Sequence, residues 1–312
     1  MTLEWAPVLA DRLHLVEGLA APDFATAEAP EVLARLEQWD APVRGYAAPD
    51  VELQELSIPG PRGPVAARVY RPRGATPAHT FMWVHGGGFV FGDLDMPEAD
   101  AVSREVCARG NVVVSVDYRK AVAGAHHPIC LDDVYAAWTW LSQDSAGFPG
   151  TRTLGGASAG ANLVAAAAQR ARDEGAAVPA SLLLIYPAVH AVMPAGSREF
   201  QAVLTQVPAR LTFPPALMEA LHTNYVGGNQ TAIPYAWPGD GDLSGFPRTL
   251  ILNCEYDSLR ASGERLAEDL YAVGCDVTCV LEHGVPHGHL NIPGLPSALH
   301  SIEVMADFIE QA

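Results

Sequence analysis

The sequence predicts an α/β protein built on one open, mostly parallel β-sheet with helices on both faces. Two observations support this fold class. Short apolar segments recur along the chain and are continuous rather than alternating, as in strands buried on both faces of a parallel sheet. Segments with helical spacing separate them, and this alternation of strand and helix is typical of βαβ units. With 312 residues, 49% of them hydrophobic, the chain is large enough for an extensive core.

The individual elements follow in order along the chain. The first 48 residues are rich in Ala, Glu and Leu and show helical spacing, for example over 31–39. Alternation then predicts a hairpin, with strands over 51–58 and 65–70 joined by a turn at 59–63. Further strands are expected at 81–84, 112–116, 153–156, 182–186, 250–254 and 277–281. Helices are expected between them at 131–142, 159–172, 263–273 and 298–310.

Residues 190–240 interrupt this alternation. They contain no clear strand, several prolines and short helical pieces around 215–225. About fifty residues between two sheet strands are too many for an ordinary loop. The sequence therefore predicts a functional insertion at this point.

The charge balance excludes some classes of partner. The chain has 36 Asp and Glu against 19 Lys and Arg, which gives a formal net charge of -17. Nucleic acids and anionic membranes both need a basic patch, so neither is expected as a partner. No segment approaches the roughly 18 apolar residues of a membrane span, and the N-terminus lacks the pattern of a signal peptide. We therefore expect a cytoplasmic protein.

The five cysteines are odd in number and form no C-x-x-C pair. Most of them lie in apolar segments, so we expect buried free thiols. Cys275 and Cys279 could be neighbours, but their spacing does not predict a disulfide.

The central motif is Gly156-Ala-Ser-Ala-Gly160, which lies between a predicted strand and a predicted helix. This is the G-x-S-x-G pattern of a nucleophile elbow. The small residues let strand and helix approach closely, so that Ser158 projects from a strained turn. The amide of Ala159, at the helix N-terminus, then faces the same space and favours negative charge. The alternative is a structural role, in which the small residues only allow a tight turn.

A second motif, His85-Gly-Gly-Gly88, directly follows the predicted strand at 81–84. Consecutive glycines expose backbone N–H groups, and such a loop can donate two hydrogen bonds to a developing oxyanion. The alternatives are a flexible turn or a phosphate-binding loop. The chain has neither of the common glycine-rich phosphate motifs, which disfavours the phosphate alternative.

A nucleophilic serine needs a base and an orienting acid, which follow it in the order acid, then histidine. Asp257 follows the predicted strand at 250–254 and is the favoured acid, with Glu255 as its rival. His287 lies in a glycine-containing loop after 277–281 and is the favoured base. The other histidines considered as the base are His289, His283 and His300.

His283, His287 and His289 also have spacings that metal ligands can adopt. The segment has no obvious set of carboxylate ligands, and a serine nucleophile needs no metal. We therefore expect neither a metal nor a cofactor.

Together these residues resemble the hormone-sensitive-lipase family of α/β-hydrolases, the bacterial carboxylesterase group. The match runs from about residue 50 to the C-terminus and consists of several motifs in the family's order. They are His85-Gly-Gly-Gly-Phe89, Val116-Asp-Tyr-Arg119, Leu131-Asp-Asp-Val-Tyr-Ala-Ala137, Gly156-Ala-Ser-Ala-Gly160, Ile185-Tyr-Pro187, Asp242-Leu-Ser-Gly-Phe-Pro247, Asp257-Ser-Leu-Arg260 and His287-Gly288.

The resemblance implies an eight-stranded, mostly parallel sheet with a helical cap. The cap would consist of residues 1–48 and 190–240, and the core of residues 49–189 and 241–312. The resemblance also implies a catalytic triad of Ser158, Asp257 and His287, and it leaves a homodimer open. The oxyanion donors that it implies are the amides of Gly86, Gly87 and Ala159.

The sequence departs from the family at several positions. Ala157 precedes the nucleophile where the family usually has Asp. The usual Tyr-Arg-Leu-Ala-Pro-Glu is replaced by the different and longer segment from Tyr118-Arg-Lys120 to Pro128. None of the departures removes a triad member, but they affect the pocket entrance and the choice of substrate.

The resemblance implies a serine carboxylesterase that hydrolyses small to medium esters through an acyl-enzyme on Ser158, with a small-molecule ester as its partner. Other acyl transfers remain open: amide or carbamate cleavage, lactone opening, or transfer to an acceptor other than water. A ligand-binding protein without catalysis, like the plant gibberellin receptors, is a further alternative. The residues Phe213, Leu217, Met218 and Tyr225 of the insertion either face the pocket or bury the apolar face of the cap.

Overall fold

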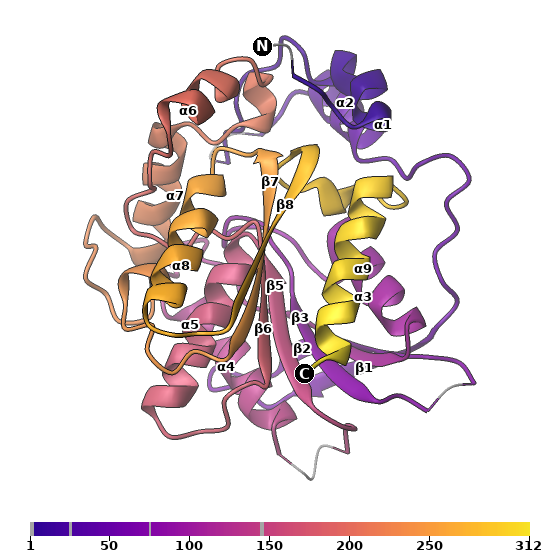
Figure 1. The fold of residues 1–312 in the computed structure, drawn as a ribbon, viewed down its shortest axis with the longest axis vertical. Helices are drawn as coiled ribbons and strands as arrows, with labels where there is room; N and C mark the ends of the chain where they lie inside the picture. The colour runs from indigo at the N-terminus through magenta and orange to yellow at the C-terminus, as the bar shows by residue number, and fades with distance from the viewer. Residues whose placement is uncertain (1–2, 25–26, 75, 144–146) are drawn as a thin grey trace.

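One eight-stranded sheet organises the chain (Figure 1). The computed structural model describes residues 3–24, 27–74, 76–143 and 147–312. The strands are β1 (Glu52–Ile58), β2 (Val65–Arg71), β3 (His79–Val84), β4 (Asn111–Asp117), β5 (Arg152–Ala157), β6 (Ser181–Ile185), β7 (Arg248–Tyr256) and β8 (Val277–Pro286). Their order in the sheet is β1-β2-β4-β3-β5-β6-β7-β8. Each strand expected from the sequence corresponds to one of them.

The sheet is parallel except at one edge. The hairpin partners β1 and β2 are antiparallel, and β2 is antiparallel to β4. All other neighbouring strands run parallel. The predicted fold class, a mostly parallel sheet with helices on both faces, is therefore confirmed.

The apolar strands are continuous because both faces of the sheet are buried. In β4, Val112, Val114 and Val116 belong to the core on one face, whereas Val113 belongs to the core on the other. Successive side chains of a strand point to opposite faces, so positions on both faces of such a strand are mainly apolar.

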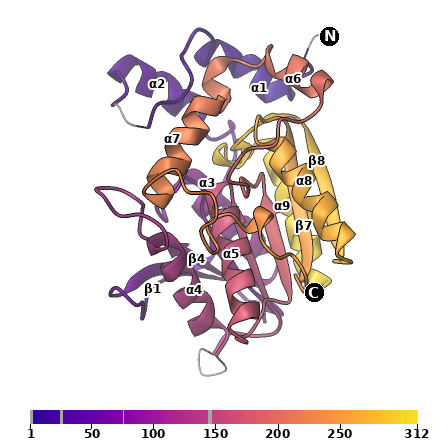
Figure 2. The same cartoon turned by 90° about the vertical axis from the view of Figure 1, so that its left-hand side faces the viewer.

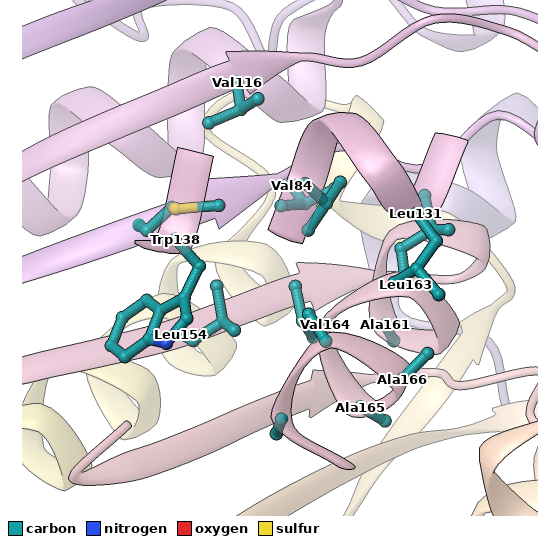
Figure 3. Close-up of a cluster of buried hydrophobic side chains, with 14 of the residues drawn as sticks. Val84, Val116, Leu131, Trp138, Leu154, Ala161, Leu163, Val164, Ala165 and Ala166 are labelled. Atoms are coloured by element: carbon teal, nitrogen blue, oxygen red, sulfur yellow. The ribbon is translucent and has the colours of Figure 1, made fainter. Parts of the chain in front are cut away.

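Helices cover both faces of the sheet. One face packs against α4 (Ile129–Leu141), α5 (Ala159–Asp173) and α8 (Arg260–Ala272). Figure 3 shows Leu131 and Trp138 of α4 beside the small side chains of α5 in this core. The other face packs against α3 (Pro97–Ala108) and α9 (Pro296–Glu310).

Helix α3 is absent from the elements expected from the sequence. Its pattern is weak because charged residues interrupt the apolar ones. A start signal was nevertheless present, since Pro97 opens the helix and Glu98 and Asp100 lie in its first turn.

A further group of helices lies over the end of the sheet at which β7 and β8 finish (Figures 1 and 2). It combines α1 (Pro7–Arg12) and α2 (Pro30–Trp39) with α6 (Arg198–Leu204) and α7 (Pro215–Val226). An ion pair between Glu28 and Arg210 joins the two chain segments. As expected, residues 190–240, all of which are described, contain no strand.

The five cysteines are free thiols. Cys107, Cys130 and Cys254 are buried as expected, whereas Cys275 is half-buried and Cys279 is exposed. The expectation is wrong for Cys279 because β8 lies at an edge of the sheet. No helix in the described ranges has the length and apolar character that a membrane crossing requires.

Candidate active site

Ser158 occupies a strained turn between β5 and α5. Its backbone has φ 54° and ψ −117°, a conformation that costs a non-glycine residue about 1–3 kcal/mol. The two flanking glycines make this turn possible. A Cβ atom on Gly156 would lie 2.6 Å from the backbone of Gly160, and one on Gly160 would lie 2.1 Å from the carbonyl oxygen of Val84. The G-x-S-x-G spacing therefore reflects backbones in direct contact.

A line of hydrogen bonds joins Ser158 to the favoured base and acid. The Nε2 atom of His287 lies 2.9 Å from the Oγ atom of Ser158, and its Nδ1 atom lies 2.7 Å from the Oδ2 atom of Asp257. Asp257 is fully buried, and its Oδ1 atom accepts a hydrogen bond from the amide of Leu259 at 2.8 Å. Because the carboxylate accepts the Nδ1 proton, the Nε2 lone pair faces the serine hydroxyl.

The sheet register explains why Asp257 and His287 meet. The ladder between β7 and β8 ends on the pair Tyr256 and Pro286. Asp257 and His287 are the next residues of the two strands, so they leave neighbouring carboxyl ends side by side. Ser158 follows β5 at the same end of the parallel sheet, where sites in such folds usually form.

The rival acid and the rival base have other partners. The Oε2 atom of Glu255 accepts the amide of Gly284 at 2.8 Å and lies 3.3 Å from the Nδ1 atom of His283. His289 is buried between Cys254, 3.2 Å from its Nδ1 atom, and Ser301, 2.9 Å from its Nε2 atom.

Burial lowers the pKa of His289 to about 3, which keeps the imidazole neutral. The Nδ1 atom of His300 lies 2.9 Å from Glu282. The three histidines with metal-like spacing, His283, His287 and His289, thus have three different partners: Glu255, Asp257 and Ser301. Among the described residues, no group of three or more possible ligands converges on one point.

Two aromatic rings flank the imidazole of His287 edge to face. The ring of Tyr186 lies 4.6 Å from it and the ring of Phe213 lies 4.8 Å from it. Phe213 belongs to the predicted insertion. Tyr186 belongs to the predicted strand at 182–186 and to the Ile185-Tyr-Pro187 motif, neither of which predicts a place in the site. Tyr186 has a positive φ of 38° and a buried hydroxyl without a hydrogen-bond partner in the described structure. Its ring therefore contributes to the site more clearly than its hydroxyl does.

The glycine loop offers a different set of amides from the expected one. The amide of Gly86 donates to the Oε2 atom of Glu98 at 3.1 Å, so it is not free to bind an oxyanion. The amides of Gly87 and Gly88 donate to no acceptor among the described residues. Ala159 is the first residue of α5, and the first amides of a helix have no partner within it. All three residues line the same cavity as Ser158.

Glu98, which the sequence analysis did not identify, lies behind this loop. Its side chain is buried, and its Oε1 atom accepts the indole N–H of Trp83 at 3.0 Å. Burial raises the pKa of Glu98 to about 7, opposed by the hydrogen bonds from Gly86 and Trp83. The contact between Glu98 and Gly86 joins residues twelve positions apart, and Glu98 lies on a helix that the sequence did not predict. No local sequence pattern could therefore have identified Glu98.

The cavity in front of Ser158 has a volume of about 250 Å³ and is mainly apolar. Both parts of the predicted cap contribute to it, with Trp39 and Asp40 from the first and Phe213 and Met218 from the second. Asp40 is not among the site residues that the sequence predicts. Burial raises the pKa of Asp40 to about 6, against the opposing charges of Arg12 and Arg210.

Of the other insertion residues considered, Leu217 and Tyr225 line neither this cavity nor the next. Tyr225 is fully buried and stacks on Phe89 at 3.8 Å. A second cavity of about 610 Å³ adjoins the first. The two have four lining residues in common: Phe213, Met218, His222 and Leu259.

Comparisons with known proteins identify the family to which the chain belongs. Residues 81–291 match a family model described as an alpha/beta hydrolase fold. The carboxylic ester hydrolase LipN of Mycobacterium tuberculosis is 33% identical over 297 residues, which cover 90% of this chain and 74% of LipN. The carboxylesterase NlhH of the same organism is 34% identical, over 86% of this chain and 84% of NlhH.

Among solved structures, a hyperthermophilic esterase from the archaeon Pyrobaculum calidifontis superimposes with a TM-score of 0.81. It is 30% identical, and the match covers 100% of this chain and 99% of that structure. The fold, the family model and these relatives lead to one assignment, which also bears out the resemblance to the carboxylesterase group. The chain belongs to the α/β-hydrolase family.

Proposed function

We propose that this protein is a carboxylic ester hydrolase that cleaves small to medium esters through an acyl-enzyme on Ser158. The observation that carries the proposal is the unbroken hydrogen-bond line from Asp257 through His287 to Ser158, beside three free amides. The relatives named as esterases in the comparisons support the same activity.

The first step is attack on the ester carbonyl. His287 takes the proton of the Ser158 hydroxyl at its Nε2 atom, 2.9 Å away, as the serine oxygen bonds to the carbonyl carbon. Asp257 holds the imidazole in the required tautomer and stabilises the imidazolium that forms. Burial of Asp257 strengthens this interaction because little water screens it.

The carbonyl oxygen becomes negative in this step and needs hydrogen-bond donors. The amides of Gly87, Gly88 and Ala159 are the donors that the geometry favours, because Glu98 occupies the amide of Gly86. Loss of one such donor costs about 3 kcal/mol in the transition state.

The intermediate then collapses and the alcohol leaves. His287 returns its proton to the leaving alkoxide oxygen as the carbon–oxygen bond breaks. A water molecule repeats the sequence on the acyl-enzyme, with His287 as the base, and releases the acid and the free Ser158.

We also propose that residues 1–48 and 190–240 form one cap over the core of residues 49–189 and 241–312. The ion pair between Glu28 and Arg210 supports this division, as do the lining residues that both segments supply to the cavity of Ser158. A cavity of about 250 Å³ accommodates small to medium substrates.

The free thiols agree with the reducing environment of the cytoplasm, which we propose as the location of the protein. A homodimer, which rests on the resemblance alone, can be tested by analytical ultracentrifugation.

The test is hydrolysis of short p-nitrophenyl esters by the purified protein and its Ser158→Ala variant. We expect the variant to lose activity, and turnover close to that of the wild type would contradict the proposal. A fluorophosphonate reagent should label the wild type at Ser158, whereas a non-catalytic binding protein would remain unlabelled. A panel of amides, carbamates and lactones then compares the other acyl transfers with ester hydrolysis.

A further inference from the structure

Lys120 is the only lysine in the chain, since every other member of its 19 Lys and Arg residues is an arginine. It lies just after β4, at the position where the resembling family usually has Leu. Its side chain is largely buried, with 14% of its surface exposed. A buried ammonium group is costly unless acceptors surround it, so its contacts need a physical explanation.

The three hydrogens of the ammonium group have three acceptors. The Nζ atom of Lys120 lies 3.2 Å from the Nε2 atom of His85, 2.8 Å from the Oδ1 atom of Asp117 and 2.5 Å from the carbonyl oxygen of Tyr118. It also lies 4.0 Å from the centre of the Tyr118 ring. A lysine can satisfy this tripod of acceptors, whereas the planar fork of an arginine cannot.

Lys120 and the carbonyl oxygen of Gly86 both require the same tautomer of His85. Because the ammonium can only donate, the Nε2 atom of His85 must accept, and the ring proton must lie on Nδ1. The Nδ1 atom is 2.6 Å from the carbonyl oxygen of Gly86 and donates to it. The other neutral tautomer would bring two lone pairs together at this distance.

Apart from Lys120 and the carbonyl of Gly86, the described groups around His85 do not supply this constraint. The ring is fully buried and stacks on Tyr118 at 4.7 Å. Asp117 lies 3.9 Å from the Nε2 atom, which is too far for a hydrogen bond. Burial lowers the pKa of His85, and Lys120 lowers it further while Asp117 opposes the shift. The backbone of Gly92 packs on the Nδ1 side of the ring and brings no charge.

The two peptide groups on either side of the Cα atom of Gly86 are thereby both held. The carbonyl oxygen of Gly86 accepts from His85 and, at 3.1 Å, from the hydroxyl of Tyr118. Its amide donates to Glu98 at 3.1 Å. Because the carbonyl of Gly86 and the amide of Gly87 belong to one planar peptide group, its orientation sets the direction of the Gly87 amide and the start of the path to Gly88.

We propose that Lys120 is a positioning residue for the oxyanion loop, acting through the Nδ1–H tautomer of His85 on the carbonyl of Gly86. The expected effect on kcat rests on the proposed ester hydrolysis, whereas the expected effect on the tautomer of His85 does not. Lys120 is not among the residues that line the cavity of Ser158. It acts on the transition state only by aligning the amides that receive the oxyanion.

The kinetic test compares Lys120→Met and Lys120→Arg with a matched control, Arg265→Met. Arg265 is an exposed cation on α8, paired with Asp269 and distant from the loop in sequence. We expect both Lys120 variants to lower kcat about 10- to 100-fold with KM within about two-fold, because oxyanion donors act in the transition state. The control should keep the wild-type kcat. A rise in KM with unchanged kcat would overturn the proposal.

The spectroscopic test uses protein labelled with ¹⁵N at histidine and long-range ¹H–¹⁵N spectra. The His85 signal, assigned by comparison with His85→Gln, should show a neutral ring protonated on Nδ1 in the wild type and in the control. In both Lys120 variants we expect loss of this fixed neutral tautomer, because the carboxylate of Asp117, 3.9 Å from the Nε2 atom, then favours a proton on Nε2 and competes with the Gly86 contact. If the variants keep it, Lys120 does not act through His85 and the proposal fails, whatever happens to kcat.

The two tests also separate this inference from the proposed function. If the wild type hydrolyses no ester, the proposed function fails, but the His85 spectrum still decides the role of Lys120. If Lys120→Met does not fold, Lys120→Arg retains the positive charge and still tests the tripod geometry. A Lys120→Arg variant with wild-type kcat and an unchanged His85 signal would overturn the proposal.

Discussion

The carboxyl group of Glu98 accepts the amide of Gly86 at 3.1 Å, directly behind the turn that carries Ser158. A Cβ atom added to Gly86 would lie 3.2 Å from the Oε2 atom of Glu98 and 3.4 Å from the Cβ atom of Ser158. The first glycine of the loop therefore lies between a buried acid and Ser158, and the amides of Gly87 and Gly88 after it donate to no acceptor among the described residues.

Replacing Glu98 with Gln should lower catalysis without weakening substrate binding. The Oε1 and Oε2 atoms of Glu98 each face an N–H donor, from Trp83 and Gly86. A glutamine has one acceptor oxygen, so its NH₂ group would face one of these donors and displace it. We expect kcat on p-nitrophenyl acetate to fall about 10-fold with KM nearly unchanged. Unchanged kcat would show that this contact does not align the loop.

The same variant should change how stability depends on pH. The pKa of Glu98 rises from 4.5 to about 7 in the fold, chiefly because of burial. Between these values the folded state retains a proton that the unfolded state has released, so stability falls as pH rises through this window. As the pH rises from 4.5 to 7, the ionisation of Glu98 should lower the free energy of unfolding by about 3 kcal/mol. This decrease should be absent in the Glu98→Gln variant.

Urea unfolding of both proteins at pH 5 and pH 8 measures this effect. The two proteins have their other titrating groups in common, so these cancel in the comparison. If the free energy of unfolding changes by the same amount between pH 5 and pH 8 in the wild type and in Glu98→Gln, the prediction is contradicted.

The sequence predicted the sheet well because its constraints are local. Most positions of a strand such as β4 are apolar because both faces are buried, and this produces a nearly continuous apolar segment that is visible without tertiary information. The elbow is similar, because Gly156 and Gly160 meet the backbone of neighbouring residues and admit no side chain.

The rest of the site depends on contacts between distant segments. Glu98 reaches Gly86 through a helix with a weak pattern, and Lys120 reaches His85 across two strands of the sheet. Asp40 enters the cavity from a segment far from Ser158 in sequence. The choice of His287 over His289 likewise depends on which way two residues of one loop point. No spacing rule encodes such contacts.

Asp257→Asn and Glu255→Gln form a matched pair for the orienting acid. The amide side chain of the Asp257→Asn variant would present an NH₂ group or a neutral oxygen to His287, so it would no longer enforce the Nδ1–H tautomer. We expect kcat to fall about 10⁴-fold. Glu255 pairs with His283 and the amide of Gly284 instead, so Glu255→Gln should keep wild-type kcat. A large loss in Glu255→Gln, with little in Asp257→Asn, would reverse the assignment of the acid.

Two substitutions of Tyr186 test the roles of its ring and of its hydroxyl group separately. The ring packs 4.6 Å from that of His287, whereas the buried hydroxyl has no partner among the described residues. Removal of a buried unsatisfied group should stabilise the fold, so Tyr186→Phe should retain kcat and gain about 1 kcal/mol in the free energy of unfolding. Tyr186→Leu should lower kcat because the imidazole loses one of its two flanking rings. Equal losses of kcat in both variants would assign the role to the hydroxyl.

Met218 should set the length of the acyl chain that the site accepts. It is one of the four residues common to the 250 Å³ cavity of Ser158 and the 610 Å³ cavity beside it. Unlike Phe213, Met218 forms no ring contact with His287, and its removal leaves the hydrogen bonds of the triad in place. Met218→Ala should therefore connect the two cavities while sparing the chemistry.

The expected result is a shift in specificity from p-nitrophenyl butyrate toward the octanoate. Each additional methylene buried in the joined cavity contributes about 0.8 kcal/mol, or about four-fold in kcat/KM. Leu204→Ala is the matched control, because Leu204 lines only the second of the two cavities. Its truncation leaves the four residues that line both cavities unchanged. The control should retain the wild-type preference. If Met218→Ala also retains the wild-type preference, Met218 does not limit the length of the acyl chain, and another part of the cap must select the substrate.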